Sequence, residues 1–147
     1  MTVIMKIQSA VRKETLFILT GTGIGTGIMI AAFYGLHRAI PESVPFGLPV
    51  VTAGIIGWLV ATANFFLMGL AVQKVASTQN EDDARRRMTV SLRYRTMMQL
   101  AWAAAALLAP VFNAAAGIIP LFLPSLLIKL RAAGNQRKGE SKKEVNA

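Results

Sequence analysis

The chain has 147 residues, of which 54% are hydrophobic and 16% are charged, and its net charge is +9. This apolar share is large for one short water-soluble domain, and the charges lie in clusters between long uncharged runs, as the acyl chains of a bilayer require. The absence of Cys and the single His exclude disulfides, thiolate metal sites, cysteine nucleophiles and histidine clusters.

The basic surplus has two interpretations. Basic residues along one face of a folded domain would indicate a nucleic-acid partner, but here Lys and Arg flank the uncharged runs. That position is typical of residues that hold helix ends at the cytoplasmic leaflet and attract anionic lipid headgroups. We therefore expect no nucleic acid, and we predict headgroup anchoring by Arg12, Lys13, Arg85, Arg86, Arg87, Arg93, Arg95, Lys129 and Arg131.

Residues 1–15 form a basic leader, and an uncharged run follows at 16–36. At a rise of about 1.5 Å per residue, a helix over this run crosses a hydrocarbon core of about 30 Å. A cleaved signal peptide is the alternative, but the run is longer than a usual signal core and no convincing cleavage site follows it. We predict a retained first span.

A polar break with Pro41 and Pro45 precedes a second apolar run at 46–72. This run is longer than a perpendicular helix needs, so the helix is expected to tilt or to project beyond the bilayer at one end.

The segment 73–95 is predicted to be a cytoplasmic helix. Thr78 and Glu81 have capping-box spacing, and three acid-to-base pairs at i,i+4 favour a helix: Glu81/Arg85, Asp82/Arg86 and Asp83/Arg87. Two interpretations stay open, a solvated helix leading into the next span or a docking site for a charged partner.

Residues 96–112 and 114–130 are two shorter apolar runs separated by Asn113, and they predict a tight hairpin of two spans. Each run is at the short end for a span, so a re-entrant hairpin that stops within the bilayer is the alternative. The tail at 131–147 is Lys-rich and polar, and this composition predicts disorder.

Orientation follows from the Lys and Arg residues, which are frequent in the leader, in 73–95 and in the tail and are scarce in the other connections. By the positive-inside rule, those three segments are cytoplasmic. The predicted fold is an all-α integral membrane domain over 16–130 with four transmembrane helices and both termini in the cytoplasm.

Small residues mark the first two spans. Gly21/Gly25 and Gly23/Gly27 are overlapping small-xxx-small pairs, a pattern that lets membrane helices approach closely. A dinucleotide-binding loop is excluded because no strand precedes these glycines. Gly54, Gly57 and Ala61 repeat the pattern in the second span. The sequence leaves open whether the partner helix belongs to this chain or to another protein.

Asn64 lies one turn beyond Ala61 in strongly apolar surroundings. An amide there needs partners, so we expect a hydrogen bond to a neighbouring helix, with a role in transport as the alternative. The first three predicted spans contain no Asp, Glu, Lys or Arg, which disfavours a proton relay or a path for divalent cations. Catalytic constellations are also lacking, so we expect no enzyme, metal or cofactor.

With these residues assembled, the sequence resembles the ATP synthase protein I family, small membrane proteins of bacterial F-type ATP synthase operons. The likeness covers about 11–130, and one departure is Ser125, where family members often have arginine. It rests on the run Val11-Arg12-Lys13-Glu14-Thr15, on the Gly54 to Gly57 helix leading to Asn64-Phe65-Phe66-Leu67, on Arg93 and Arg95, and on Pro120-Leu121-Phe122-Leu123-Pro124.

The resemblance implies a multi-pass protein of the bacterial inner membrane that assists assembly of the rotor ring of c subunits, and a link to magnesium supply has also been proposed for the family. Subunit c and other membrane subunits of the synthase would be its partners, and our hypothesis is that the Gly21/Gly25 face and the Gly54/Gly57/Ala61 face receive their helices. The alternatives are a small ion transporter or pore formed by several copies around Asn64, or a holin-like lysis protein.

Overall fold

The computed structural model describes the backbone of residues 9–145 and the side chains of residues 9–136. All regular structure in this part of the chain is helical: α1 (Ser9–Ala39), α2 (Leu48–Ala76), α3 (Glu81–Leu108) and α4 (Ala114–Val145). The helices α1 and α2 and the stretch Ala114–Gln136 of α4 are long and apolar enough to cross a membrane. The first eight residues of the expected leader and the last two of the tail lie outside the described residues.

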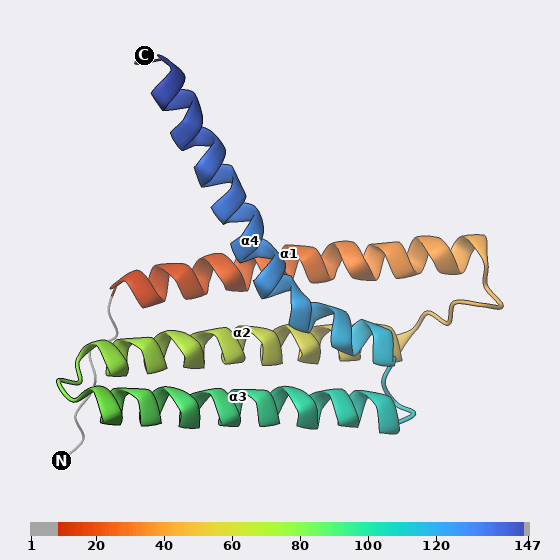
Figure 1. The fold of residues 1–147 in the computed structure, drawn as a ribbon. Helices are drawn as coiled ribbons and strands as arrows, with labels where there is room; N and C mark the ends of the chain where they lie inside the picture. The colour runs from red at the N-terminus through yellow and green to blue at the C-terminus, as the bar shows by residue number, and fades with distance from the viewer. Residues whose placement is uncertain (1–8, 146–147) are drawn as a thin grey trace.

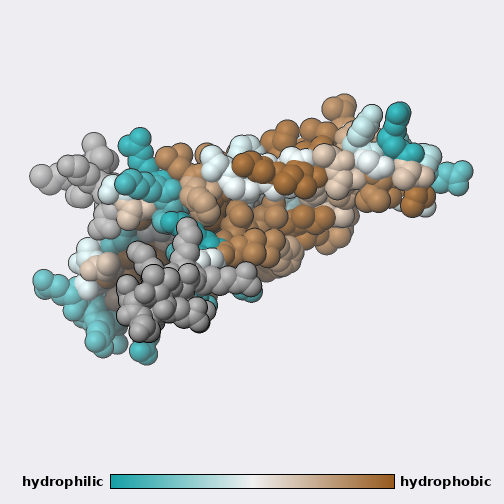
Figure 2. Space-filling view, turned by 90° about the horizontal axis from the view of Figure 1, so that it is seen from above, coloured by the Kyte–Doolittle hydropathy of each residue, from teal (hydrophilic) through white to brown (hydrophobic). Residues whose placement is uncertain are grey.

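The helix α2 lies at the centre and contacts the other three (Figure 1). The start of α1 and the α2–α3 turn lie at one end of the bundle, and the α1–α2 connection and the α3–α4 turn lie at the other. The helix α4 crosses α1, and its last turns extend away from the bundle. Hydrophobic residues cover the middle of the molecule, and hydrophilic residues gather toward its ends (Figure 2). Exposed large apolar side chains lie on all four helices, as expected where lipid is the solvent.

The α2–α3 turn differs from the prediction. The N-cap of α3 is Asn80, whose side chain accepts a hydrogen bond from the Asp82 backbone N–H at 3.0 Å. Thr78 instead closes the end of α2, because its hydroxyl donates to the Lys74 carbonyl at 2.8 Å. The predicted capping box at Thr78 is therefore wrong, and 73–95 is divided between the end of α2 and the first half of α3.

The three acid-to-base pairs predicted for this segment do not close to ion pairs within the described residues. Their side chains are exposed, and holding two long side chains together in water gains little. Glu81, Asp82 and Asp83 occupy the first turn of α3, where negative charge interacts favourably with the helix dipole.

The α3–α4 connection is a tight turn, as predicted, but α3 ends at Leu108, earlier than the expected span boundary at 112. Pro110 accounts for this end, since the residue before a proline disfavours the helical conformation. Asn113 then caps α4 by accepting from the Ala116 N–H at 3.0 Å, and its own N–H donates to the Pro49 carbonyl at 3.2 Å. The uncharged part of α3, residues 96–108, is about 20 Å long at about 1.5 Å per residue, short of a typical hydrocarbon core.

The basic tail also differs from the prediction of disorder, because the backbone of α4 continues as a helix to Val145. Arg131, Ala132, Ala133 and Gln136 are strong helix formers. Extending an existing helix needs no new nucleus, so these residues continue the turn already formed in the apolar part of α4.

The bundle packs through small residues instead of a wide core of large ones. Met29, Val50, Ala53 and Ala116 form the buried apolar cluster. Beside it, α2 and α4 meet at Gly57, where an added Cβ would lie 2.5 Å from the Gly117 carbonyl oxygen. This contact is between backbones, so no side chain can turn aside to make room.

Replacement of Gly57 by Ala should therefore push α2 and α4 apart and lower the free energy of unfolding by about 1–3 kcal/mol. The matched control is Gly27→Ala, at a glycine with no atom within 4 Å of an added Cβ. That change should leave stability equal or slightly higher, because Ala favours helix over Gly. Unfolding of the purified protein by SDS, followed by circular dichroism, measures both, and equal stability of the two variants would contradict the Gly57 contact.

Candidate functional site

Gly21 and Gly25 of α1 are covered by α4 of the same chain. An added Cβ would lie 2.8 Å from Leu127 Cδ1 at Gly21 and 3.0 Å from Leu123 Cδ1 at Gly25. The pair therefore packs helices, as its spacing predicts, and the helix that it packs against is internal. This face has no room for a second protein while α4 lies on it.

The second predicted pair, Gly23 and Gly27, does not form one contact face. Gly23 lies against the ring of Trp58, with an added Cβ 3.4 Å from the indole. The Trp58 Nε1–H donates across the interface to the Leu19 carbonyl at 3.0 Å, which fixes α2 against α1. Gly27 faces open space.

The small-residue face predicted on α2 is also filled. Gly54 lies against α1, where an added Cβ would be 3.2 Å from Met29 Cε, and Gly57 lies against α4. Ala61 is 1% exposed. The central position of α2 explains this result, because neighbouring helices cover it on several sides. The hypothesis that this face receives a helix of another protein is therefore not compatible with the folded monomer.

A small-residue face on α1 remains uncovered by the described residues. Gly27, Ala31 and Gly35 follow each other at i,i+4, and an added Cβ at either glycine meets no atom within 4 Å. The flanking side chains Ile24 and Ile28 are 66% and 65% exposed. We call these five residues the open α1 face. The spacing is visible in the sequence, but the sequence does not show which of several small-residue faces stays open.

Asn64 makes the interhelical hydrogen bond that the sequence predicts. Its side chain is buried, and Oδ1 accepts from Arg95 Nε of α3 at 2.7 Å. The sequence does not identify this partner, because Arg95 precedes the third predicted span and is predicted to anchor to headgroups. Asn64 and Arg95 lie nearly equally far from the α2–α3 turn, so an antiparallel hairpin with a tight turn brings them together.

The other predicted anchoring residues are exposed. Arg131 is half-exposed, pairs with Glu14 at 2.6 Å and lies over the Phe17 ring at 4.7 Å, which joins α4 to the start of α1. Of the Lys and Arg residues in 9–136, only Arg38 lies beside the α1–α2 connection. The remaining exposed anchors are Arg12 and Lys13 on α1, Arg85, Arg86, Arg87 and Arg93 on α3, and Lys129 on α4.

The bundle contains a second indole hydrogen bond and buried threonine hydroxyls without a partner among the described residues. Trp102 Nε1–H donates to the Gly117 carbonyl at 3.0 Å, so α3 is tied to the point where α2 and α4 meet. The hydroxyls of Thr26 and Thr62 are buried without a hydrogen-bond partner. Among the described side chains, no three His, Asp or Glu residues lie close enough together to hold a metal ion.

No protein-family model, curated protein or solved structure matches this chain. The likeness to ATP synthase protein I therefore rests on the sequence motifs alone.

The Asn64–Arg95 bond should contribute measurably to stability. Asn64→Ala leaves a half-buried guanidinium without its acceptor, and we expect a loss of about 1–2 kcal/mol in the free energy of unfolding. A double-mutant cycle with Arg95→Ala should give a coupling energy of about 1 kcal/mol.

Thr62→Val is the control for that measurement, because it removes a buried hydroxyl of α2 that has no partner. Its stability should equal or exceed that of the native chain. A coupling energy near zero would show that the hydrogen bond is not formed in the bilayer.

Proposed function

We propose that this chain is a non-catalytic accessory protein of the bacterial inner membrane that binds helices of a partner within the bilayer and assists assembly of the F-type ATP synthase rotor ring. The observation that carries the proposal is the open α1 face, a small-residue stripe that no described part of the chain covers. The faces first expected to bind a partner, at Gly21/Gly25 and Gly54/Gly57/Ala61, are used for folding.

The physical reason is the nature of helix association in lipid. Between membrane helices, small residues at i,i+4 allow close backbone approach and extensive van der Waals contact. The stripe Gly27, Ala31 and Gly35 offers such a surface without any rearrangement of the bundle. Subunit c is the proposed partner because the sequence resembles ATP synthase protein I, and small-residue hairpins suit a surface of this kind.

The proposed topology places the start of α1, the α2–α3 turn and the end of α4 in the cytoplasm, with the α3–α4 hairpin crossing the bilayer as the third and fourth spans. Its support is the gathering of Lys and Arg at one end of the bundle, which the positive-inside rule assigns to the cytoplasm. The apolar part of α3 is short, so a local thinning of the bilayer or tilt of the helix would accompany a full crossing.

Reporter fusions and cysteine labelling test this topology. A reporter enzyme that is active only outside the cytoplasm should give no signal at Ala147 and a strong signal at Ser43, in the α1–α2 connection. The chain has no Cys, so Val111→Cys places a unique thiol on the exposed hairpin tip. A membrane-impermeant maleimide should label it from outside intact spheroplasts. An unlabelled thiol together with the expected reporter pattern would indicate a hairpin that stops within the bilayer.

Substitutions on the open α1 face test the proposed function. Gly27→Leu with Gly35→Leu should reduce co-purification of subunit c about fivefold, equivalent to about 1 kcal/mol of binding free energy, because the bulky side chains block close approach. Folding should be unchanged, since a Cβ added at either glycine meets no atom of the described residues within 4 Å.

The matched control is Ala63→Leu, a similar enlargement at an exposed alanine of α2, on a different helix from the open α1 face. Its recovery of subunit c should equal that of the native chain. Full recovery with the double variant would refute binding through this face.

A further inference from the structure

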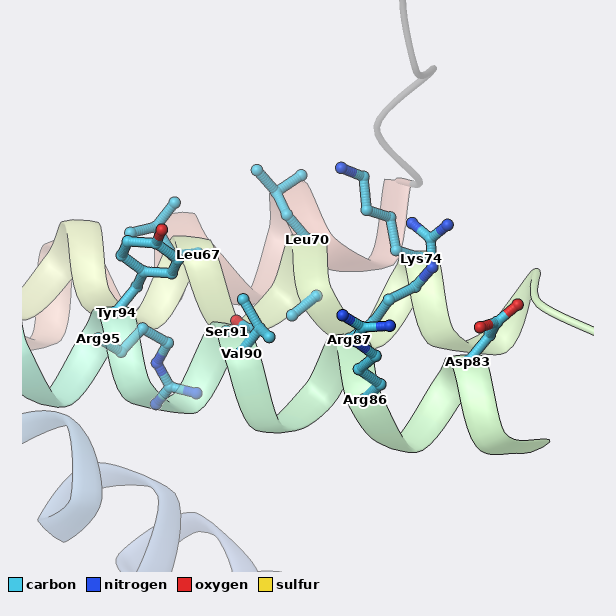
Figure 3. A pocket seen from close by; sticks show the side chains of 11 residues that line it. Leu67, Leu70, Lys74, Asp83, Arg86, Arg87, Val90, Ser91, Tyr94 and Arg95 are labelled. Carbon is cyan, nitrogen blue, oxygen red and sulfur yellow. The ribbon is translucent and has the colours of Figure 1, made fainter. Parts of the chain in front are cut away.

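A groove of about 760 Å³ lies between the last third of α2 and the first half of α3 (Figure 3). It belongs to neither the open α1 face nor the glycine contacts. Its walls combine charged and apolar side chains from the two helices, including Lys74 and Leu70 from α2 and Arg86, Arg87 and Val90 from α3.

The end of the groove nearest the α2–α3 turn is strongly basic. Lys74 and Arg87 extend from the two helices to the same edge, and Arg86 follows next to them (Figure 3). None of these three cations has an ion-pair partner among the described residues. Asp83 is the single acid in the lining, so it does not balance them. This arrangement leaves a positive potential that an anion would neutralise.

The rest of the groove is mainly apolar. Leu67, Leu70, Val90 and the ring of Tyr94 line it toward the middle of the bundle. Arg95 also borders this end, but its Nε already donates to Asn64. Polarity therefore changes along the helix axes, from three unpaired cations near the end of the bundle to aliphatic side chains nearer its centre. A phospholipid in the adjoining leaflet changes in the same way along its length, from a charged headgroup to apolar acyl chains.

We propose that this groove binds one anionic phospholipid, with its phosphate between Lys74, Arg86 and Arg87 and an acyl chain along Leu67, Leu70 and Val90. Arginine forks bind phosphate oxygens through paired hydrogen bonds, and basic pockets between membrane helices are suited to acidic headgroups. The first eight residues of the chain are an unsuitable occupant of the basic end, because they carry Lys6 and no acid. The proposal is independent of any synthase partner.

Three ligands distinguish binding of an anionic lipid from binding of a neutral lipid or of a free phosphate ester. Delipidated full-length protein in a neutral detergent is titrated with phosphatidylglycerol, with phosphatidylcholine and with glycerol phosphate, and binding is followed by native mass spectrometry and thermophoresis. Phosphatidylglycerol should bind one to one. Phosphatidylcholine should bind at least about tenfold more weakly because it carries no net charge, and glycerol phosphate should bind more weakly because it lacks acyl chains.

Variants with equal charge loss locate the site. Arg86→Gln with Arg87→Gln should reduce affinity for phosphatidylglycerol about tenfold or more. Arg85→Gln with Arg93→Gln removes the same charge from α3 outside the groove and should change affinity less than about threefold. Val90→Asn should weaken phosphatidylglycerol binding and leave glycerol phosphate binding unchanged. Circular dichroism and gel filtration check folding, and Lys74→Gln is a second groove variant on the other helix.

Several results would overturn the proposal. If the groove variants and the control variants lose affinity equally, phosphatidylglycerol binds to the basic surface in general and not to the groove. Glycerol phosphate binding as tightly as phosphatidylglycerol would exclude a role for the acyl chain. If phosphatidylglycerol does not bind while an acidic amphipathic peptide does, the groove is a protein-docking site.

Discussion

The contact between the backbones of α2 and α4 at Gly57 and Gly117 constrains the rest of the structure. No side chain fits there, and Trp102 of α3 donates its indole N–H to the Gly117 carbonyl at the same point. Three helices therefore converge within one turn of α4. The remaining helix, α1, closes the bundle through Trp58 on one side and through Leu123 and Leu127 on the other. Because lipid tails are as apolar as leucine, close contacts and hydrogen bonds of this kind are what can hold helices together in a bilayer.

Small residues serve two purposes in this chain, and the structure separates them. Glycines that face another helix of the bundle are needed for folding, whereas the open α1 face is available for a second molecule. The same separation applies to the cations. Arg95 is held by Asn64 and Arg131 by Glu14, but Lys74, Arg86 and Arg87 have no ion-pair partner in the described part of the chain. The open α1 face and the cations without an ion-pair partner are therefore the surfaces at which we expect other molecules to bind.

The sequence predicts the helices well because long uncharged runs determine where a chain can cross lipid, and residues 16–36 and 46–72 fall almost entirely within α1 and α2. It also predicts that Asn64 bonds to another helix, since an amide in apolar surroundings needs hydrogen-bond partners. It does not identify Arg95 as the donor or α4 as the helix that covers Gly21 and Gly25. A small or polar residue indicates that another helix packs there, but it does not indicate which helix. Thr78 and Asn80 are comparable caps by type, and the geometry of the turn selects Asn80.

The α3–α4 turn has a bearing on how the protein is made. Asn113 caps α4 with its side chain and gives its own backbone N–H to Pro49 at the start of α2, and the tip 109–113 contains no charged residue. Transfer of this tip into the bilayer therefore moves no ionised group through hydrocarbon. Since its acceptor belongs to α2, the Asn113 backbone N–H finds its partner only when α2 is already in place, and α2 precedes the hairpin in the order of synthesis.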